Sequence, residues 1–328
     1  MLPMPKSLSH NFVYRSSLRL TYASQVVTRL VLTLHYVRTF ERLIIYTRDV
    51  VRGQMLRNMH ANRASLFLRL MFLHVRRRFF YNSSNKKNLW ISRVIMLVAF
   101  MRVAFLRYVL PYGQMSYWRA TVIINLLSVI SQDLCVLIWR RFVVSKYTLT
   151  RFYTLHFLLP LAMAILILGH MHLLHATRRS SLSYSFLKLS FFPYFAVKDA
   201  FLWSMIFIVF MLFCLLLPNY LGDAENYILA NPLVTPVHIK PEWYFLFAYA
   251  ILRCIPNKTM RVVALRASVV LPVVSILRNS STLMTSLNFM SIVFIFLTIF
   301  RRMPIIVHYF VSSQILSVWY FSLILLFN

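Results

Sequence analysis

Glycine and acidic residues are both scarce in this sequence. It has four glycines in 328 residues, whereas glycine makes up about 7% of an average protein and is more frequent still in membrane helices. Seven Asp and Glu stand against 36 Lys and Arg, which gives a formal net charge of +29. A clustered excess of positive charge indicates nucleic-acid binding, but here the basic residues are scattered through apolar runs. We therefore expect no nucleic-acid partner.

Cysteine is also sparse. The three cysteines, Cys135, Cys214 and Cys254, are far apart in the chain and form no Cys-x-x-Cys motif. The sequence therefore carries neither the attachment motif of a covalent c-type haem nor a zinc knuckle.

Long apolar runs are what the sequence has in abundance. Hydrophobic residues make up 60% of the chain and aromatic residues 16%, and the mean hydropathy is +0.68. These values are typical of a polytopic membrane protein. We predict an all-α fold, a polytopic membrane helical bundle with about eight transmembrane helices and a four-helix core. The predicted spans are 14–37, 56–80, 89–110, 150–175, 197–217, 260–277, 284–300 and 305–327.

Three other segments are distinctive. Residues 1–29 are basic and free of acidic residues, as in a transit peptide, but their apolar periodicity continues into the first predicted span. Residues 114–147 are too polar to cross a bilayer, and we expect surface helices there, with Trp118 and Trp139 in the aromatic belt. Residues 218–242 form a long loop rich in proline.

Two predicted spans each carry a pair of histidines fourteen positions apart, His60 with His74 and His156 with His170. Fourteen residues are close to four helical turns, about 21 Å of rise, so both rings of a pair lie on one face. A single histidine in an apolar helix is more often a packed core residue. The repeated spacing instead favours two bis-histidine haem sites stacked across the membrane, since neutral imidazole ligates iron.

We expect two domains on this basis. Residues 1–195 form a haem-binding N-terminal bundle that includes the interfacial helices. Residues 196–328 form a set of C-terminal helices together with the proline-rich loop.

The end of that loop carries a specific motif, Pro241-Glu242-Trp243-Tyr244, within the segment 231–258. This segment resembles cytochrome b of the mitochondrial and bacterial cytochrome bc complexes, and the resemblance extends over nearly the whole chain. Further matching motifs are Arg48-Asp49-Val50, Met59-His60-Ala61-Asn62, Tyr108 to Ser116, Thr148 to Phe152 and Leu221-Gly222-Asp223.

The resemblance implies roles for the histidines. It implies that His60 and His156 ligate a low-potential haem, and that His74 and His170 ligate a high-potential haem. It also places Arg57 and Arg151 near the propionates of the first haem and Arg77 near the second, where charge-assisted pairing would hold them.

The resemblance implies two quinone sites as well. The residues implied for quinol oxidation are Glu242, Tyr244 and Tyr249, with Glu242 as a proton acceptor whose pKa burial would raise. Those implied for quinone reduction are His175, Lys198 and Asp199. Two simpler interpretations stay open: Glu242 as a carboxylate favoured at a helix start, and Lys198 with Asp199 as an interfacial ion pair.

The function implied is that of the redox subunit of ubiquinol–cytochrome c reductase, respiratory complex III, which contributes to proton translocation. The implied cofactors are two non-covalent b-type haems, with ubiquinol and ubiquinone as substrates. The implied partners are the Rieske iron–sulfur protein, cytochrome c1, other complex III subunits and a second copy of the complex, in the lipid bilayer of the mitochondrial inner membrane. The alternative is a haem-free polytopic transporter or structural subunit.

Arginine occupies many positions where this family has glycine, which is a departure from the family pattern. Fifteen of the 28 arginines fall there: Arg15, Arg19, Arg29, Arg63, Arg76, Arg78, Arg93, Arg107, Arg119, Arg140, Arg141, Arg178, Arg261, Arg301 and Arg302. Each arginine at mid-membrane costs about 2.5–3.5 kcal/mol, and fifteen would exceed the ~5–15 kcal/mol net stability of ordinary proteins. The hypothesis is that these codons deliver glycine, through a reassigned code, editing or unusual decoding.

Overall fold

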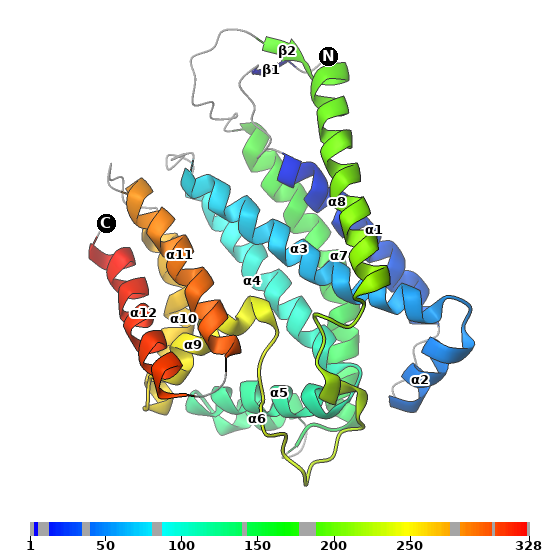
Figure 1. The fold of residues 1–328 in the computed structure, drawn as a ribbon, viewed down its shortest axis with the longest axis vertical. Helices are drawn as coiled ribbons and strands as arrows, with labels where there is room; N and C mark the ends of the chain where they lie inside the picture. The colour runs from blue at the N-terminus through cyan, green and yellow to red at the C-terminus, as the bar shows by residue number, and fades with distance from the viewer. Residues whose placement is uncertain are drawn as a thin grey trace. The chain divides into compact units, whose positions relative to one another are not determined.

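The computed structural model describes residues 3–5, 13–34, 40–80, 87–139, 143–176, 188–275, 283–303 and 306–326. These residues are mainly helical and include twelve α-helices (Figure 1). The helices are α1 (Tyr14–Leu34), α2 (Phe40–Asp49), α3 (Gly53–Phe80), α4 (Lys87–Val109), α5 (Gln114–Asn125), α6 (Gln132–Trp139), α7 (Lys146–Ala176), α8 (Ala196–Leu216), α9 (Leu246–Cys254), α10 (Lys258–Ser275), α11 (Leu283–Arg302) and α12 (Val307–Leu326).

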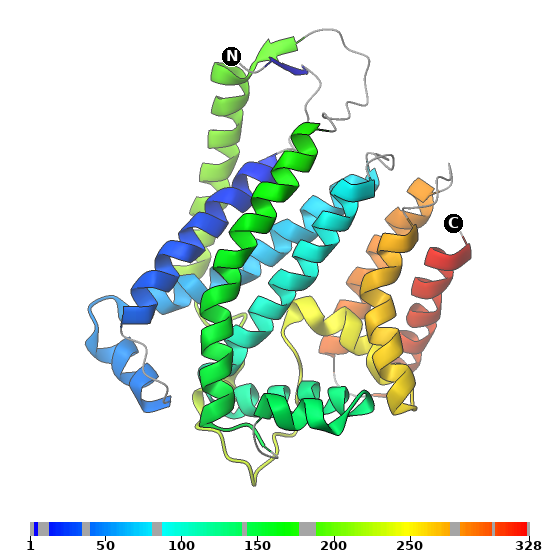
Figure 2. The same cartoon turned by 180° about the vertical axis from the view of Figure 1, so that it is seen from behind.

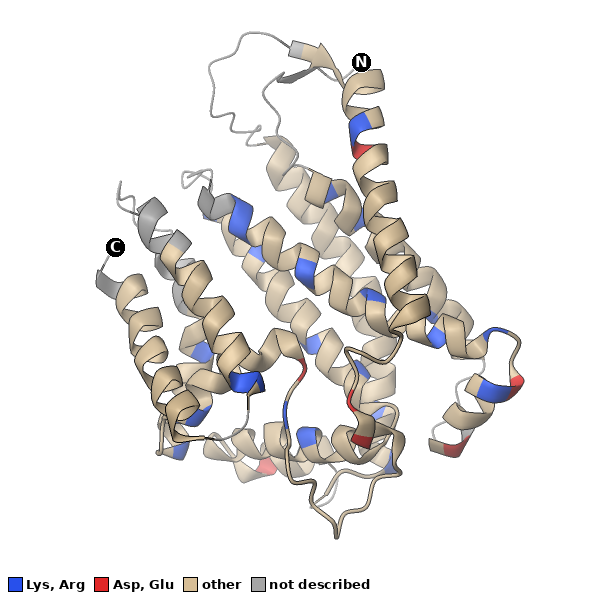
Figure 3. Ribbon diagram, viewed as in Figure 1, with Lys and Arg blue, Asp and Glu red and all other residues tan. Residues whose placement is uncertain are grey.

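The predicted all-helical fold is confirmed. Eight long helices, α1, α3, α4, α7, α8, α10, α11 and α12, coincide with the eight predicted spans. Within the described part of the chain, three segments are long and apolar enough to cross a membrane by composition, namely Lys87–Val109, Lys146–Ala176 and Phe191–Leu216. Arginines interrupt the apolar character of other long helices, and Figure 3 shows them in blue along several helices rather than gathered in one patch.

The chain divides into two compact units. The first contains Met1–Val37, Arg42–Ser83 and Ile167–Leu221, and the second contains Arg38–Glu41, Ser84–Leu166 and Gly222–Asn328. Helix α7 therefore contributes its first part to the second unit and its last turns to the first. The predicted boundary at residue 195 separates the expected haem-binding helices from the C-terminal helices, whereas the two units are defined by packing. The two-domain division therefore stays a prediction.

In the first unit, α1 packs along α3, and α8 also contacts α3. Both ribbon views show α1 beside α3 (Figures 1 and 2). Side-chain contacts join these helices: Gln25 Nε2 donates to the His60 carbonyl oxygen at 3.0 Å, and Asn62 Nδ2 donates to the Pro218 carbonyl oxygen at 2.9 Å. These contacts fix which face of α3 is turned toward α1 and α8.

A short two-stranded sheet also belongs to the first unit. Strand β1 (Pro3–Pro5) pairs antiparallel with β2 (Lys188–Ser190), with Pro3 opposite Ser190. A π-helical turn, Phe191–Phe195, then leads into α8. The sequence analysis predicts no strand here, because a three-residue strand has too little periodicity to detect.

In the second unit, α4, α5, α6 and the first part of α7 share an apolar core. Its members include Leu106, Val109, Tyr117, Cys135 and Trp139. Trp139 is only 4% exposed, so its side chain is part of this core. The sequence predicts instead a position in the aromatic belt. The C-terminal helices α9, α10, α11 and α12 pack against one another in the same unit (Figure 2).

The turn between α4 and α5 requires a glycine. Gly113 bridges to Leu229, and a Cβ on Gly113 would collide with the Asn226 carbonyl oxygen. Asn226 Oδ1 also accepts hydrogen bonds from the Ser116 amide at 2.9 Å and the Ser116 hydroxyl at 2.8 Å. These contacts hold the proline-rich loop against the start of α5.

Candidate haem and quinol sites

Two of the four predicted ligands, His74 and His170, lie close together in the first unit, with one ring edge-on to the other. They come from α3 and the last part of α7, and their ring centroids are 6.4 Å apart with an interplanar angle of 69°. Their exposed fractions are 8% and 9%. Both rings are therefore buried and close, as the sequence predicted for one pair.

The distance between these rings fits a metal held between them. A metal–imidazole bond is about 2.0–2.1 Å, and the ring centre lies about 1.2 Å beyond the nitrogen, which gives roughly 6.4 Å between ring centres. The described residues contain no cluster of three or more His, Cys, Asp and Glu that could hold a metal ion. A haem needs only axial ligands from the protein, so the residues present fit a haem.

His60 and His156 belong to different units, and the hydrogen-bond partner of each Nδ1 indicates the tautomer of the ring. His156 Nδ1 lies 3.1 Å from the Val103 carbonyl oxygen. Because a carbonyl oxygen only accepts, Nδ1 carries the hydrogen, and the lone pair that can ligate a metal is on Nε2. An Nδ1–H bond to a carbonyl is the arrangement that orients histidine ligands in metal sites.

The same argument applies to His60. Its Nδ1 lies 2.8 Å from the Thr28 hydroxyl oxygen. That hydroxyl donates its hydrogen to the Ser24 carbonyl oxygen at 2.9 Å, so it accepts from His60 Nδ1–H. The ligating lone pair of His60 is therefore on Nε2 as well.

The three arginines expected near haem propionates occupy different settings. Arg57 is half-buried on α3, three residues before His60. Arg77 follows His74 by three residues on the same helix and is 7% exposed. Arg151 Nη1 donates to the Leu137 and Ile138 carbonyl oxygens near the end of α6, the second at 3.2 Å.

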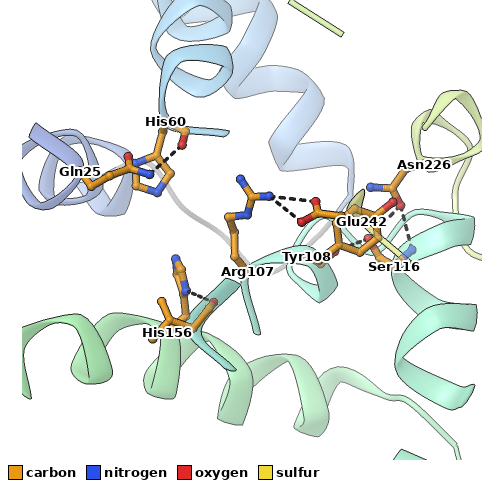
Figure 4. Close-up of polar contacts among 9 residues, drawn as sticks. Gln25, His60, Arg107, Tyr108, Ser116, His156, Asn226 and Glu242 are labelled. Atoms are coloured by element: carbon orange, nitrogen blue, oxygen red, sulfur yellow. Dashed lines mark hydrogen bonds and ion pairs between the residues drawn. The ribbon is translucent and has the colours of Figure 1, made fainter. Parts of the chain in front are cut away.

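The carboxylate of the loop motif forms an ion pair in the second unit. Arg107 Nη2 from α4 donates to both carboxylate oxygens of Glu242, at 2.9 and 3.2 Å (Figure 4). The two side chains are 15% and 12% exposed. Glu242 precedes the 3₁₀ turn Trp243–Phe245 but makes no capping hydrogen bond to it, so its carboxylate binds Arg107 instead of the helix start.

Glu242 lies outside the spanning helices, at the end of the loop. Burial raises the pKa of its carboxyl, while the Arg107 and Arg119 guanidiniums act in the opposite direction. Arg119 itself binds Asp223 at 2.7 Å and lies 4.4 Å from the centre of the Tyr108 ring. Sequence analysis missed both ion pairs, since nothing in a sequence pairs residues more than a hundred positions apart.

An apolar cavity of 340 Å³ lies in the second unit, and Pro241, the residue before Glu242, is part of its wall, whereas Glu242 is not among the lining residues. Its walls come from α4, α5, α9, α10 and the loop, and they include Phe105, Arg119, Pro241 and Tyr249. Apolar cavities of about 300–1,000 Å³ are typical of small-molecule sites. Of the two tyrosines implied for quinol oxidation, Tyr249 lines the cavity, while Tyr244 has no exposed surface.

The residues expected at the quinone-reduction site all belong to the first unit. His175 is exposed near the end of α7, and Lys198 and Asp199 are half-buried in the first turns of α8. Their joint role stays a prediction. Among the arginines at family glycine positions, Arg140, Arg141 and Arg178 lie outside the described residues.

Comparison with known proteins gives matches to two family models and a likeness to solved structures. Residues 1–178, more than half of the chain, match the family model described as Cytochrome b/b6/petB. Residues 229–321 match the model described as Cytochrome b(C-terminal)/b6/petD. The fold is similar to that of a chain of the hyperthermophilic respiratory Complex III, with a TM-score of 0.91 and 25% sequence identity over 98% of this chain and 91% of that chain.

Proposed function

The chain belongs to the cytochrome b family and serves as the cytochrome b of a quinol–cytochrome c reductase, and from this premise we propose that it holds two b-type haems between α3 and α7. The observation that carries the proposal is the 6.4 Å separation of the His74 and His170 rings. That separation leaves room for one iron between two imidazole nitrogens. Haem, when bound, supplies reversible one-electron transfer.

The second haem is held by His60 and His156. Support comes from the tautomers that Thr28 and the Val103 carbonyl impose, because each leaves the Nε2 lone pair for ligation. His60 and His156 would hold the low-potential haem, and His74 and His170 the high-potential haem. Arg57, Arg77 and Arg151 would then be near the propionates, and their positive charges would offset those carboxylates.

Quinol oxidation takes place in the apolar cavity. Oxidation of a quinol to a quinone releases two protons and two electrons, so the site needs a proton acceptor. Glu242 adjoins Pro241 in the cavity wall, and its carboxylate accepts one proton from a quinol hydroxyl. Tyr249 lines the cavity and positions the quinol ring, and Tyr244 packs behind it. The apolar walls exclude water from the reacting oxygen atoms.

The released electrons take two routes. One leaves to the Rieske iron–sulfur protein and then to cytochrome c1. For the other, haems held by the two histidine pairs would supply one-electron transfer toward a quinone near His175, Lys198 and Asp199. Lys198 and His175 would supply hydrogen bonds and protons to the quinone oxygens, and Asp199 would hold Lys198 or relay a proton.

The cellular setting follows from the same family membership. The long apolar helices indicate a multi-pass membrane protein. An uninterrupted chain with a spacing of fourteen in both histidine pairs favours the mitochondrial inner membrane, with ubiquinone as the substrate, other complex III subunits as partners and a homodimeric complex. The fit of the residues to haem argues against a haem-free transporter.

A reduced-minus-oxidised absorbance spectrum of the purified complex tests the proposal. We expect b-type haem bands in the spectrum of the intact complex. After denaturing extraction, we expect no haem to remain on the polypeptide. A spectrum without b-type bands would favour the haem-free alternative. Haem that stays attached to the denatured chain would exclude non-covalent binding.

A further inference from the structure

Five arginines are buried inside helices although they belong to none of the haem positions. They are Arg29 on α1, Arg63 on α3, Arg93 on α4, Arg119 on α5 and Arg301 on α11, and each is between 5% and 7% exposed. A buried guanidinium is tolerated in a membrane protein mainly where an opposite charge or a water-filled cavity accompanies it.

This chain has few opposite charges to offer. If each of the seven Asp and Glu paired with one of the 36 Lys and Arg, 29 basic residues would remain without an acidic counterpart. Arg63 Nη1 donates to the Ser24 carbonyl oxygen at 3.2 Å and faces the Phe210 ring at 5.5 Å. Arg301 lies 4.4 Å from the centre of the Tyr249 ring. Neutral partners such as those of Arg63 and Arg301 do not offset the charge of a buried guanidinium, whereas Arg119 does have a carboxylate partner, Asp223, at 2.7 Å.

Glycine is deficient in the same chain. At about 7% of residues, roughly 23 glycines would be expected, and the sequence has four. Membrane helices pack closely through small residues at their interfaces. Arg63 reaches a backbone oxygen of α1 from α3, so the largest basic side chain occupies an interface where the smallest residue is usual.

One further arginine, Arg107, and one of the five, Arg119, lie where they oppose the proposed chemistry. Arg107 occupies both carboxylate oxygens of Glu242, the group that has to receive a proton. Arg119 is one of the residues that line the cavity, and its guanidinium binds Asp223. A quinol is uncharged, so neither guanidinium has a counterpart in the substrate.

We propose that positions 29, 63, 93, 107, 119 and 301 carry glycine in the polypeptide that the cell makes, the arginine codons there being decoded or edited to glycine. Glycine at 107 releases the Glu242 carboxylate, and glycine at 119 enlarges the cavity, whose lining still includes Arg102. The consequences at 107 and 119 rest on the proposed function; the identity of the residues does not.

Arg57, Arg77 and Arg151 provide internal controls. Arg77 is as buried as the five arginines above, at 7% exposed, but it lies one turn from His74, where haem propionates would supply negative charge. We expect Arg57 to be near the other haem in the same way. Arginine should therefore persist at these three positions.

Peptide mass spectrometry of the complex purified from its native membranes tests the proposal. Chymotrypsin is suitable because it cleaves at aromatic residues whichever residue stands at these positions. The expected result is glycine at the six positions and arginine at 57, 77 and 151. Arginine, or any other residue that is not glycine, at any of the six positions would overturn the proposal. The haem spectrum of the same sample reports on the proposed function independently.

Discussion

The rings of His74 and His170 lie with their centroids 6.4 Å apart, although the residues are 96 positions apart in the sequence. The two histidines come from the helices whose paired spacing of fourteen suggested stacked sites. Their burial and separation match what two axial ligands of one iron require. The same helices carry His60 and His156, whose ring nitrogens are oriented by hydrogen bonds to Thr28 and the Val103 carbonyl oxygen.

The orientation of His60 should depend on Thr28. Replacing Thr28 by Val removes the hydroxyl that accepts from His60 Nδ1 but keeps the branched shape of the side chain. Loss of such an outer partner typically lowers metal-site affinity about 10–100-fold. We expect weaker binding of the low-potential haem and a shifted midpoint potential, measured by redox titration, with Thr28→Ser restoring both. A Thr28→Val complex with the original potential would show that Thr28 does not orient His60.

Replacing Glu242 by Gln should slow quinol oxidation. General acid–base groups contribute typically about 10²–10⁴-fold, and an amide cannot accept the proton. The measurement is the steady-state rate of quinol-dependent cytochrome c reduction, with haem content confirmed by absorbance. Glu225→Gln is a matched control on the same loop, outside the cavity wall. Equal rates in Glu242→Gln and the control would remove Glu242 from the mechanism.

The pH dependence should respond to position 107. Burial raises the pKa of Glu242, and Arg107 and Arg119 lower it. The carboxylate accepts a proton only when ionised, so the rate falls as pH drops through this pKa. In a chain carrying Arg107, we expect Arg107→Gly to raise the pKa and move the acidic limb of the pH–rate profile to higher pH. Asp223, bound to Arg119, stays in place in both chains.

Arg266→Gly is the control for that comparison. Arg266 is exposed on α10 and far in sequence from the loop motif, so it carries the same loss of charge without touching Glu242. A shift of the acidic limb in this control, or a shift to lower pH in Arg107→Gly, would contradict the account of the carboxylate.

The cavity should be sensitive to the size of the side chain at Tyr249. This residue lines the cavity and also faces the Arg301 guanidinium. Tyr249→Phe keeps the ring and should change the KM for quinol little, whereas Tyr249→Ala removes a wall and should raise the KM several-fold or more. Steady-state kinetics at varied quinol concentration separates the two. Similar KM values in both variants would place the quinol elsewhere.

Much of the fold followed from local patterns. The eight long helices were predictable because apolar periodicity is a local signal. The C-terminal end of α4, just before Pro111 and Gly113, was predictable because helix-stopping residues are also local signals. The histidine spacing predicted that His74 and His170 would meet. The spacing of the other pair gives the same expectation, but His60 and His156 belong to different packing units, so their pairing stays a prediction.

What local patterns did not contain was long-range side-chain pairing. The bond between Arg107 and Glu242 spans 135 positions, and the Asn226 contacts to Ser116 span 110. These contacts arise only when the loop folds back onto α4 and α5. The strand pairing of Pro3 with Ser190 was missed for the same reason.

The most direct test of the central claim is a potentiometric titration of the haem absorbance in His74→Ala, His170→Ala and the control His172→Ala, which changes an exposed histidine on the same helix. The account predicts two b-type components in the unaltered complex and in His172→Ala. It predicts that His74→Ala and His170→Ala each lose the same, higher-potential component. Retention of both components in either variant, or loss of different components in the two, would contradict it.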